Sequence, residues 1–297
     1  MSQKSKWTAL LATIRTPNIP SVACNVLTGS ILASIAAPIQ ILHAISAIAS
    51  GVLLYLAGNL LNDWHDRDWD ALHRPERALP QKFFQPSSYL ALAIACSLAG
   101  LAPTATNPRS LAIAAIILGL ILIYTKSHKS SALAIIPMGL CRAFLPTLGY
   151  FACSDHAVTP SLILIAAALL IHTCGLSLVA RSESKPDRHP SHLFLFAYPL
   201  AVAIACLAAH ISGTRSIIHL WSAALPYLLW TFLALFLLRR SAFTGVSMLL
   251  AGIPLVDWAF LIPFAKHPDA SLPWLSLCAP PIAFILGKYL QKIVPAT

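Results

Sequence analysis

Acidic residues gather in one stretch of the sequence, residues 62–80, directly after the apolar run 41–61. If the apolar run is a helix that continues into this stretch, Asn62, Asp66 and Asp70 recur every fourth residue and lie on one helix face. We call these three residues the ladder. The stretch holds half of the chain's 10 acidic residues, namely Asp63, Asp66, Asp68, Asp70 and Glu76.

The ladder predicts a metal site that binds phosphate. Like charges stacked on one helix face destabilise the helix, and carboxylates at the mouth of a membrane helix are costly unless a positive charge offsets them. Mg²⁺ removes this repulsion, and proteins usually hold it with one or two carboxylates and substrate phosphates. The alternative is a solvated, helix-capping charge cluster at the membrane surface. The spacing, with Arg74 and Arg77 just beyond it, favours the metal–phosphate site.

The rest of the chain must position this site within a membrane. Hydrophobic residues make up 58% of the 297 residues and charged residues 10%, which is typical of an integral membrane protein. We predict an all-α, polytopic membrane helical bundle in a single domain, residues 1–297, with a basic N-terminal tail at residues 1–16. Spans of about the length that crosses roughly 30 Å of hydrocarbon are predicted at residues 19–37, 41–62, 88–104, 110–125, 132–152, 160–180, 193–211, 218–238, 246–264 and 273–290.

The distribution of Lys and Arg predicts the orientation. Most of these 20 residues lie in the tail and in every second loop, so the positive-inside rule places the N-terminus and the ladder at the cytoplasmic face of the cell (inner) membrane. A formal charge of +10 could indicate a nucleic acid partner, but short loops between spans argue against it and leave membrane lipids as the surroundings. The loop after span 110–125, with Tyr124, Lys126 and Lys129, reaches the same face as the ladder.

Two charged residues fall inside predicted spans. A charge buried in a membrane helix marks a functional site by default, and the rival interpretation is a structural partner within the bundle. We predict a pocket role for Arg142 and a structural role for Asp257.

Several segments of the sequence resemble the UbiA family of intramembrane prenyltransferases. Residues 62–70, NDWHDRDWD, are similar to its first aspartate-rich motif, NDxxDxxxD, and residues 74–80 to the RPxRPLP segment that follows. Residues 14–18 and 25–29 are similar to its opening RPxN and NVLxG pattern. Residues 129–149 resemble the EboC-like branch most closely. The order and spacing of these segments make the resemblance specific over about the first half of the chain.

The resemblance implies nine helices around a central cavity open to lipid, so nine to ten transmembrane helices are expected. It implies a Mg²⁺-dependent transferase: a polyprenyl diphosphate loses its diphosphate, and a small acceptor attacks the resulting allylic cation. The expected catalytic residues are Asn62, Asp66, Asp70 and Lys129. The expected substrate-binding residues are Asn25, Arg74, Arg77, Tyr124, Lys126 and Arg142. The expected metal ligands are Asn62, Asp63, Asp66, Asp70, Glu183 and Asp187.

The family's second motif, DxxxD, differs in this sequence. It is expected near residues 178–184, where Ala180 and Ser184 stand at the aspartate positions. Glu183 and Asp187 lie four residues apart and could substitute in part, although the proline between them disturbs a helix. This departure leaves open a non-catalytic UbiA-like protein that binds or transports an isoprenoid or lipid-like metabolite. An ion-coupled transporter ranks last, because coupling sites usually lie near mid-membrane.

Overall fold

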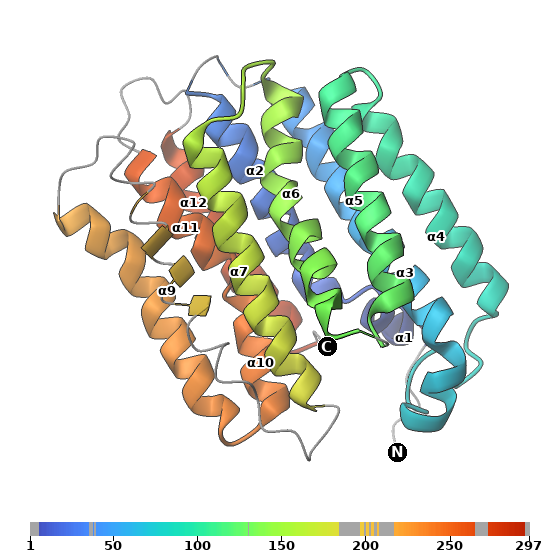
Figure 1. Cartoon of the computed structure of the whole chain (residues 1–297). Helices are drawn as coiled ribbons and strands as arrows, with labels where there is room; N and C mark the ends of the chain where they lie inside the picture. Colours follow the sequence, from blue (N-terminus) through green and yellow to red (C-terminus); the bar gives the residue numbers. More distant parts are fainter. Residues whose placement is uncertain are drawn as a thin grey trace.

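The structure, a computed structural model, describes most of the chain, and every regular element within that part is helical (Figure 1). The described residues are 6–35, 38, 40–129, 131–183, 197, 198, 200, 201, 203, 204, 207, 217–264 and 273–294. The helices are α1 (Lys6–Thr13), α2 (Ile19–Ala33), α3 (Ile41–His73), α4 (Pro86–Leu101), α5 (Pro108–Ser127), α6 (Ile135–Cys153), α7 (Pro160–Glu183), α9 (Ile217–Leu238), α10 (Ala242–Ala251), α11 (Ile253–Phe264) and α12 (Pro273–Leu290). Short 3₁₀ turns occur at Thr16–Asn18, Ala102–Thr104 and Ala132–Ala134.

The helices lie side by side as a membrane bundle. Within the described residues, 7 stretches are long and apolar enough to cross a membrane: α3, α4 with its 3₁₀ turn, α5, α6, most of α7, most of α9, and α10 with α11. The predicted first span, 19–37, is shorter in the structure, because α2 has 15 residues. The predicted span 193–211 lies largely outside the described residues. The expected count of nine to ten transmembrane helices is therefore not confirmed.

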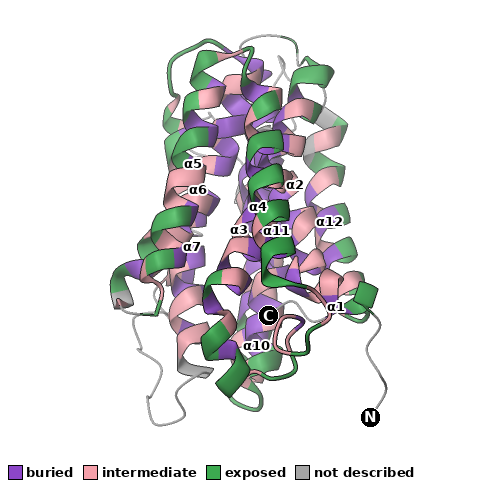
Figure 2. Cartoon of the chain, turned by 90° about the vertical axis from the view of Figure 1, so that its right-hand side faces the viewer, coloured by how far each residue is buried: buried purple, intermediate pink, exposed green. Residues whose placement is uncertain are grey.

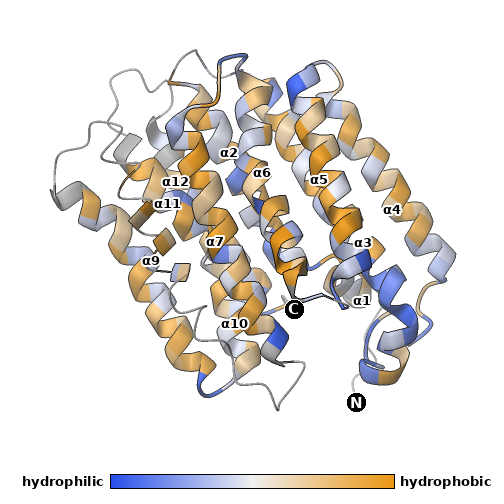
Figure 3. Cartoon of the chain, viewed as in Figure 1, coloured by the Kyte–Doolittle hydropathy of each residue, from blue (hydrophilic) through white to orange (hydrophobic). Residues whose placement is uncertain are grey.

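Large apolar side chains cover the outside of the bundle. Exposed residues line the outward faces of α4 and α5 (Figure 2), and these faces are largely hydrophobic (Figure 3). Leu98 on α4 and Phe232 on α9 are 64% and 72% exposed. A bilayer solvates such side chains as well as a protein core does, so this surface suits an integral membrane protein.

The α3 helix is one uninterrupted helix of 33 residues. At 1.5 Å per residue it is about 50 Å long, which exceeds the roughly 30 Å of hydrocarbon in a bilayer. Its last turns therefore extend past the apolar part of the bundle and keep the ladder on one helix face, as predicted. The helix ends at His73, and Arg74 is its non-helical cap residue, because the proline that follows disfavours helical backbone at the residue before it.

The α2 and α6 helices pack with their backbones in contact. A Cβ atom on Gly29 would lie 1.7 Å from the carbonyl oxygen of Pro146, and one on Gly149 would lie 1.9 Å from that of Val26. Glycine at these positions permits the close approach, as small residues do in membrane bundles. The contact brings polar residues of α2 against polar residues of α6.

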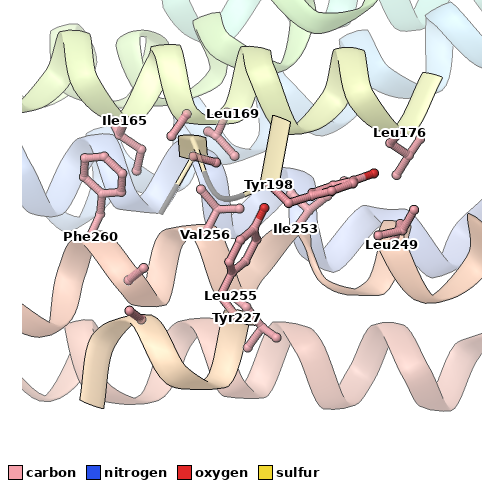
Figure 4. Packing of buried hydrophobic residues seen from close by; sticks show 14 of the residues in the cluster. Ile165, Leu169, Leu176, Tyr198, Tyr227, Leu249, Ile253, Leu255, Val256 and Phe260 are labelled. Carbon is pink, nitrogen blue, oxygen red and sulfur yellow. The ribbon is translucent and has the colours of Figure 1, made fainter. Parts of the chain in front are cut away.

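A second packing centre joins the C-terminal helices to α7. Tyr227 of α9 and Phe260 of α11 are 1% and 0% exposed and pack against Ile165 and Leu169 of α7 (Figure 4). His172 of α7 lies in the same region, within 2.9 Å of the Tyr227 hydroxyl and 3.2 Å of the Leu249 carbonyl. The C-terminal helices are thus fixed against the helices that carry the site.

Candidate active site

The end of α3 buries its polar residues instead of exposing them. Asn62, Asp63, Asp66 and Asp70 are 7%, 7%, 6% and 2% exposed. By contrast, the side chain of Asp68, on another face of the same turns, is 87% exposed. Buried carboxylates require charged partners, and the structure provides a partner for each of them.

Arg77 bridges two of these carboxylates. The chain turns back after α3, so that Nη1 of Arg77 lies 3.0 Å from Oδ1 of Asp63 and 2.9 Å from Oδ2 of Asp70. The Arg77 side chain is 18% exposed, so these charge-assisted hydrogen bonds are only partly screened by solvent. Arg74, three residues earlier, is partly buried; burial first, and then the neighbouring Arg77, lower the pKa of its guanidinium.

Asp66 receives its partners from the loop after α5. Nζ of Lys129 lies 2.7 Å from Oδ1 of Asp66, and Nε2 of His128 lies 2.9 Å from Oδ2. The other ring nitrogen of His128 lies 3.0 Å from the Thr125 carbonyl, so the ring is held between two oxygen atoms. The Lys129 ammonium also lies 4.4 Å from the centre of the Trp69 ring, a cation–π contact.

The end of α7 joins the same cluster. Nη2 of Arg181 donates to the carbonyl of His128 at 2.7 Å. The ends of α3, α5 and α7 therefore meet at one place, and the sequence predicted this for the ladder and the loop after span 110–125.

Arg15, in the turn between α1 and α2, faces the cluster from the N-terminal side. Its backbone is left-handed, with φ 48° and ψ 53°; this conformation is uncommon for a residue other than glycine. Burial lowers the pKa of the Arg15 guanidinium, but Asp63 above all, with Tyr55, Tyr124 and Asp66, raises it, and the net pKa lies above its ordinary value. Arg15 thus stays charged beside the carboxylates.

The residues of the ladder fit a Mg²⁺ ion. The side-chain oxygen of Asn62 is buried and has no hydrogen-bond partner, and an orphaned buried acceptor is a ready metal ligand. Carboxylate and amide oxygens are the hard ligands that Mg²⁺ prefers. No group of three or more His, Cys, Asp or Glu side chains in the described part of the chain could hold a metal by itself. The ion would therefore need oxygens from a substrate, as Mg²⁺ usually does with phosphates.

Two of the expected substrate-binding residues lie deeper in the bundle. Asn25 of α2 and Arg142 of α6 are 0% and 9% exposed, and Nη1 of Arg142 lies 3.1 Å from Oδ1 of Asn25. Tyr124 is partly buried near the cluster, with its ring centre 5.3 Å from that of His128. Lys126 is exposed on α5, and its role in binding stays a prediction.

The second carboxylate pair falls at the edge of what the structure describes. Glu183 is the last residue of α7, and its side chain lies outside the described set. Asp187 lies outside the described residues altogether. Their expected role in metal binding stays a prediction.

Two residues of the cluster were not predicted from the sequence. Arg15 belongs to the opening motif, but nothing in its local pattern shows that its side chain reaches the end of α3. For His128, the only indication in the sequence was its position next to Lys129. Both bring positive charge or hydrogen-bond donors to buried carboxylates.

A cavity of about 390 Å³ opens at the other end of the bundle. The start of α3, the turn before α5 and the end of α6 line it, with Gln40, His43, Asn107 and Asp155 among its residues. No expected site residue lines it. The expected central cavity open to lipid stays a prediction.

A comparison with protein families decides the identity of the fold. A model of the UbiA prenyltransferase family matches residues 22–277, well over half of the chain. The chain belongs to the UbiA prenyltransferase family. This UbiA chain is 32% identical over 127 residues to digeranylgeranylglyceryl phosphate synthase of Methanothrix thermoacetophila. That match covers 42% of this chain and 47% of the synthase, so it spans about half the length of that relative.

Solved structures of UbiA homologues share the fold. The apo structure of a homologue from Aeropyrum pernix K1 superposes with a TM-score of 0.67 at 20% identity, covering 83% of this chain and 98% of that one. A homologue from Archaeoglobus fulgidus, bound to GPP and Mg²⁺, superposes with a TM-score of 0.60 at 14% identity, covering 86% of this chain and 99% of that one. At these identities the likeness concerns the fold.

Proposed function

We propose that the chain is a Mg²⁺-dependent prenyltransferase. It transfers an isoprenoid group from a polyprenyl diphosphate to a small acceptor at the cytoplasmic face of the cell membrane. The observation that carries this proposal is the cluster at the end of α3, where three buried carboxylates and an unpartnered amide oxygen face Arg15, Arg77 and Lys129. A site for a metal-bound diphosphate needs both sets of charges, because the metal requires oxygens and the diphosphate requires cations.

Each member of the cluster has a role in this proposal. Asn62, Asp66 and Asp70 would hold Mg²⁺, which supplies a Lewis acid that neutralises charge on the departing diphosphate. Lys129 and Arg77 pair with the carboxylates in the free protein, and their N–H groups can also bind phosphate oxygens. Preorganised donors of this kind stabilise the charge that develops on a leaving group.

The remaining expectations belong to the same proposal. The bias of Lys and Arg to one side supports a cytoplasmic site and N-terminus, and the single domain, residues 1–297, would enclose the prenyl chain in a cavity open to lipid. Glu183 and Asp187 would supply the second carboxylate pair. The homologue that is bound to GPP and Mg²⁺ supports a prenyl diphosphate and Mg²⁺ as the ligands proposed for this chain. Assignment to the EboC-like branch stays a prediction.

The rival function is a non-catalytic protein that binds or transports an isoprenoid. Ala180 and Ser184, at the aspartate positions of the second motif, favour it. Both functions require the protein to bind a prenyl diphosphate, but only the transferase releases diphosphate from it. One experiment therefore separates them.

Release of diphosphate from prenyl diphosphates is the test. Purified protein is incubated with geranyl, farnesyl or geranylgeranyl diphosphate and a panel of acceptors, with Mg²⁺ or with EDTA, and released diphosphate is measured. We expect Mg²⁺-dependent release that Asp66→Asn abolishes. Asp68→Asn is the matched control, because it removes the same charge from an 87% exposed side chain on the same helix. Binding without release in the unaltered protein would support the rival function.

A further inference from the structure

One carboxylate lies deep in the bundle, away from the cluster at the end of α3. Asp257 of α11 is 0% exposed, and among the described acidic residues it alone lies within the apolar C-terminal spans. An ionisable group inside a membrane protein is expensive to bury and usually serves a function. The sequence predicted only a structural role for it.

Asp257 contacts a residue of the expected substrate pocket. Its Oδ2 accepts a hydrogen bond of 2.6 Å from Nδ2 of Asn25, and Oδ1 of Asn25 accepts one of 3.1 Å from Nη1 of Arg142. The amide of Asn25 is thereby fixed in one orientation, because a carboxylate holds its NH₂ end and a guanidinium holds its oxygen. We call Arg142, Asn25 and Asp257 the inner relay; it joins α6, α2 and α11.

The inner relay lies below the ladder along the bundle axis. A Cβ atom on Gly51 of α3 would lie 2.8 Å from a methyl group of Val26, so Asn25 is at about the level of Gly51. Asn62 is eleven residues further along α3, which corresponds to roughly 16 Å. Tyr55 lies between the two levels: its hydroxyl donates to the Arg15 carbonyl at 3.2 Å, and Arg142 interacts electrostatically with it.

The relay is incomplete as a purely structural network. Oδ1 of Asp257 is buried without a hydrogen-bond partner, and such a group costs free energy that a scaffold alone has no reason to retain. What the carboxyl group does supply is the acceptor for the Asn25 amide. Without it, the NH₂ group of Asn25 would be a buried donor without a partner, and the amide would be free to turn.

This fixed orientation of the Asn25 amide matters for the proposed reaction, on which the inference rests. When the C–O bond to diphosphate breaks, the electron pair leaves with diphosphate and the prenyl carbon becomes an allylic cation. The acceptor then forms a bond to that carbon and loses a proton to solvent. We propose that Asp257 is a positioning residue for prenyl transfer: it holds the NH₂ group of Asn25, so that the amide oxygen stays turned toward Arg142 in the expected substrate pocket.

The test compares Asp257→Leu with Asp257→Asn. Leucine removes the acceptor that holds the Asn25 amide, so we expect kcat to fall roughly 5- to 20-fold. Asparagine keeps a side-chain oxygen that can accept the same hydrogen bond, and this variant should retain most of kcat. The KM for the prenyl diphosphate should change little in both variants, because the cluster at the end of α3 is untouched.

Controls separate this role from simple packing. Tyr227→Phe removes a buried hydroxyl 2.9 Å from His172 and changes none of the three relay residues, so it should lower the melting temperature with little change in kcat. If Asp257→Leu retains full kcat, or if Asp257→Asn loses as much kcat as Asp257→Leu, the inference is overturned while the transferase function stands. Release of diphosphate by the unaltered protein distinguishes the two failures, since an inert protein overturns the proposed function and the inference with it.

Discussion

Arg77 is the cation on which two buried carboxylates depend, so its removal tests the electrostatics of the whole cluster. In Arg77→Gln, Asp63 and Asp70 lose the hydrogen bonds of 3.0 and 2.9 Å that now neutralise them. Breaking a buried ion pair from one side costs about 3–5 kcal/mol. Because the Arg77 side chain is 18% exposed, we expect the lower end, about 3 kcal/mol. At roughly 2–4 °C per kcal/mol, the melting temperature should fall by about 6–12 °C.

Mg²⁺ should reverse part of this loss. Carboxylates that have lost their arginine gain more from a bound divalent cation than carboxylates that are already paired. The melting temperature is therefore measured in detergent with EDTA, and again with Mg²⁺ and a non-hydrolysable prenyl diphosphate analogue. We expect a larger Mg²⁺-dependent rise for Arg77→Gln than for the unaltered protein in the presence of the metal alone. The analogue should add less to the variant, since one phosphate-binding cation is gone.

The control is a second arginine of the same region. Arg67 lies 3.6 Å from Asp68, and their side chains are 36% and 87% exposed; an exposed pair of this kind contributes about 0–1 kcal/mol. Arg67→Gln should shift the melting temperature by no more than about 4 °C. If Arg77→Gln melts within that same range, or if Mg²⁺ stabilises both variants equally, the carboxylates do not depend on Arg77 and the reasoning is refuted.

Three further predictions concern other parts of the bundle. Lys129→Met should weaken Mg²⁺-dependent diphosphate binding on the order of tenfold or more, because a charge-assisted hydrogen bond contributes about 1.5–3 kcal/mol. Lys126→Met should weaken this binding less. Equal losses of affinity in a binding titration would show that Lys126 contacts the ligand as well. Asn62→Leu removes a buried acceptor without a partner, so the metal-free protein should be as stable as the unaltered one or more stable by about 1–3 kcal/mol. Stabilisation by Mg²⁺ with the prenyl diphosphate analogue should disappear. Denaturation in EDTA, and again in Mg²⁺ with the analogue, measures the two effects. Gly29→Ala should destabilise the fold by more than about 3 kcal/mol, because the new Cβ would meet a carbonyl oxygen at 1.7 Å. Gly119→Ala is the control, because a Cβ there would have nothing within 4 Å. It should be neutral or stabilising by up to about 1 kcal/mol. Equal melting temperatures for these two glycine variants would contradict the packing.

The local part of the site could be predicted because its signals lie within one helix. Nothing between Ile41 and His73 stops a helix, so a four-residue spacing necessarily places the ladder on one face. The helix ends before Pro75 for an equally local reason. The partners of the ladder were only partly predictable: Lys129 and Arg77 were expected nearby, but the pairing of Arg77 with Asp63 and Asp70 depends on how the loop returns.

The contacts that sequence reasoning missed connect distant segments. Asn25 and Asp257 are separated by 232 positions and meet at 2.6 Å, and no local periodicity reports such a contact. Arg15 is a similar case, since its left-handed backbone and its approach to Asp63 follow from how α1 and α2 are placed. The shorter α2, in place of the predicted span 19–37, shows that hydropathy locates a span better than it locates its ends.

The contact between the backbones of α2 and α6 limits how these two helices can move. Two helices separated only by glycine hydrogens cannot slide or separate without losing the dispersion contacts along their whole interface. The pair should therefore behave as a rigid unit. A movement that widens the bundle would therefore have to displace other helices and leave α2 and α6 together. Two glycine hydrogens in place of two methyl groups thus make α2 and α6 move as one unit.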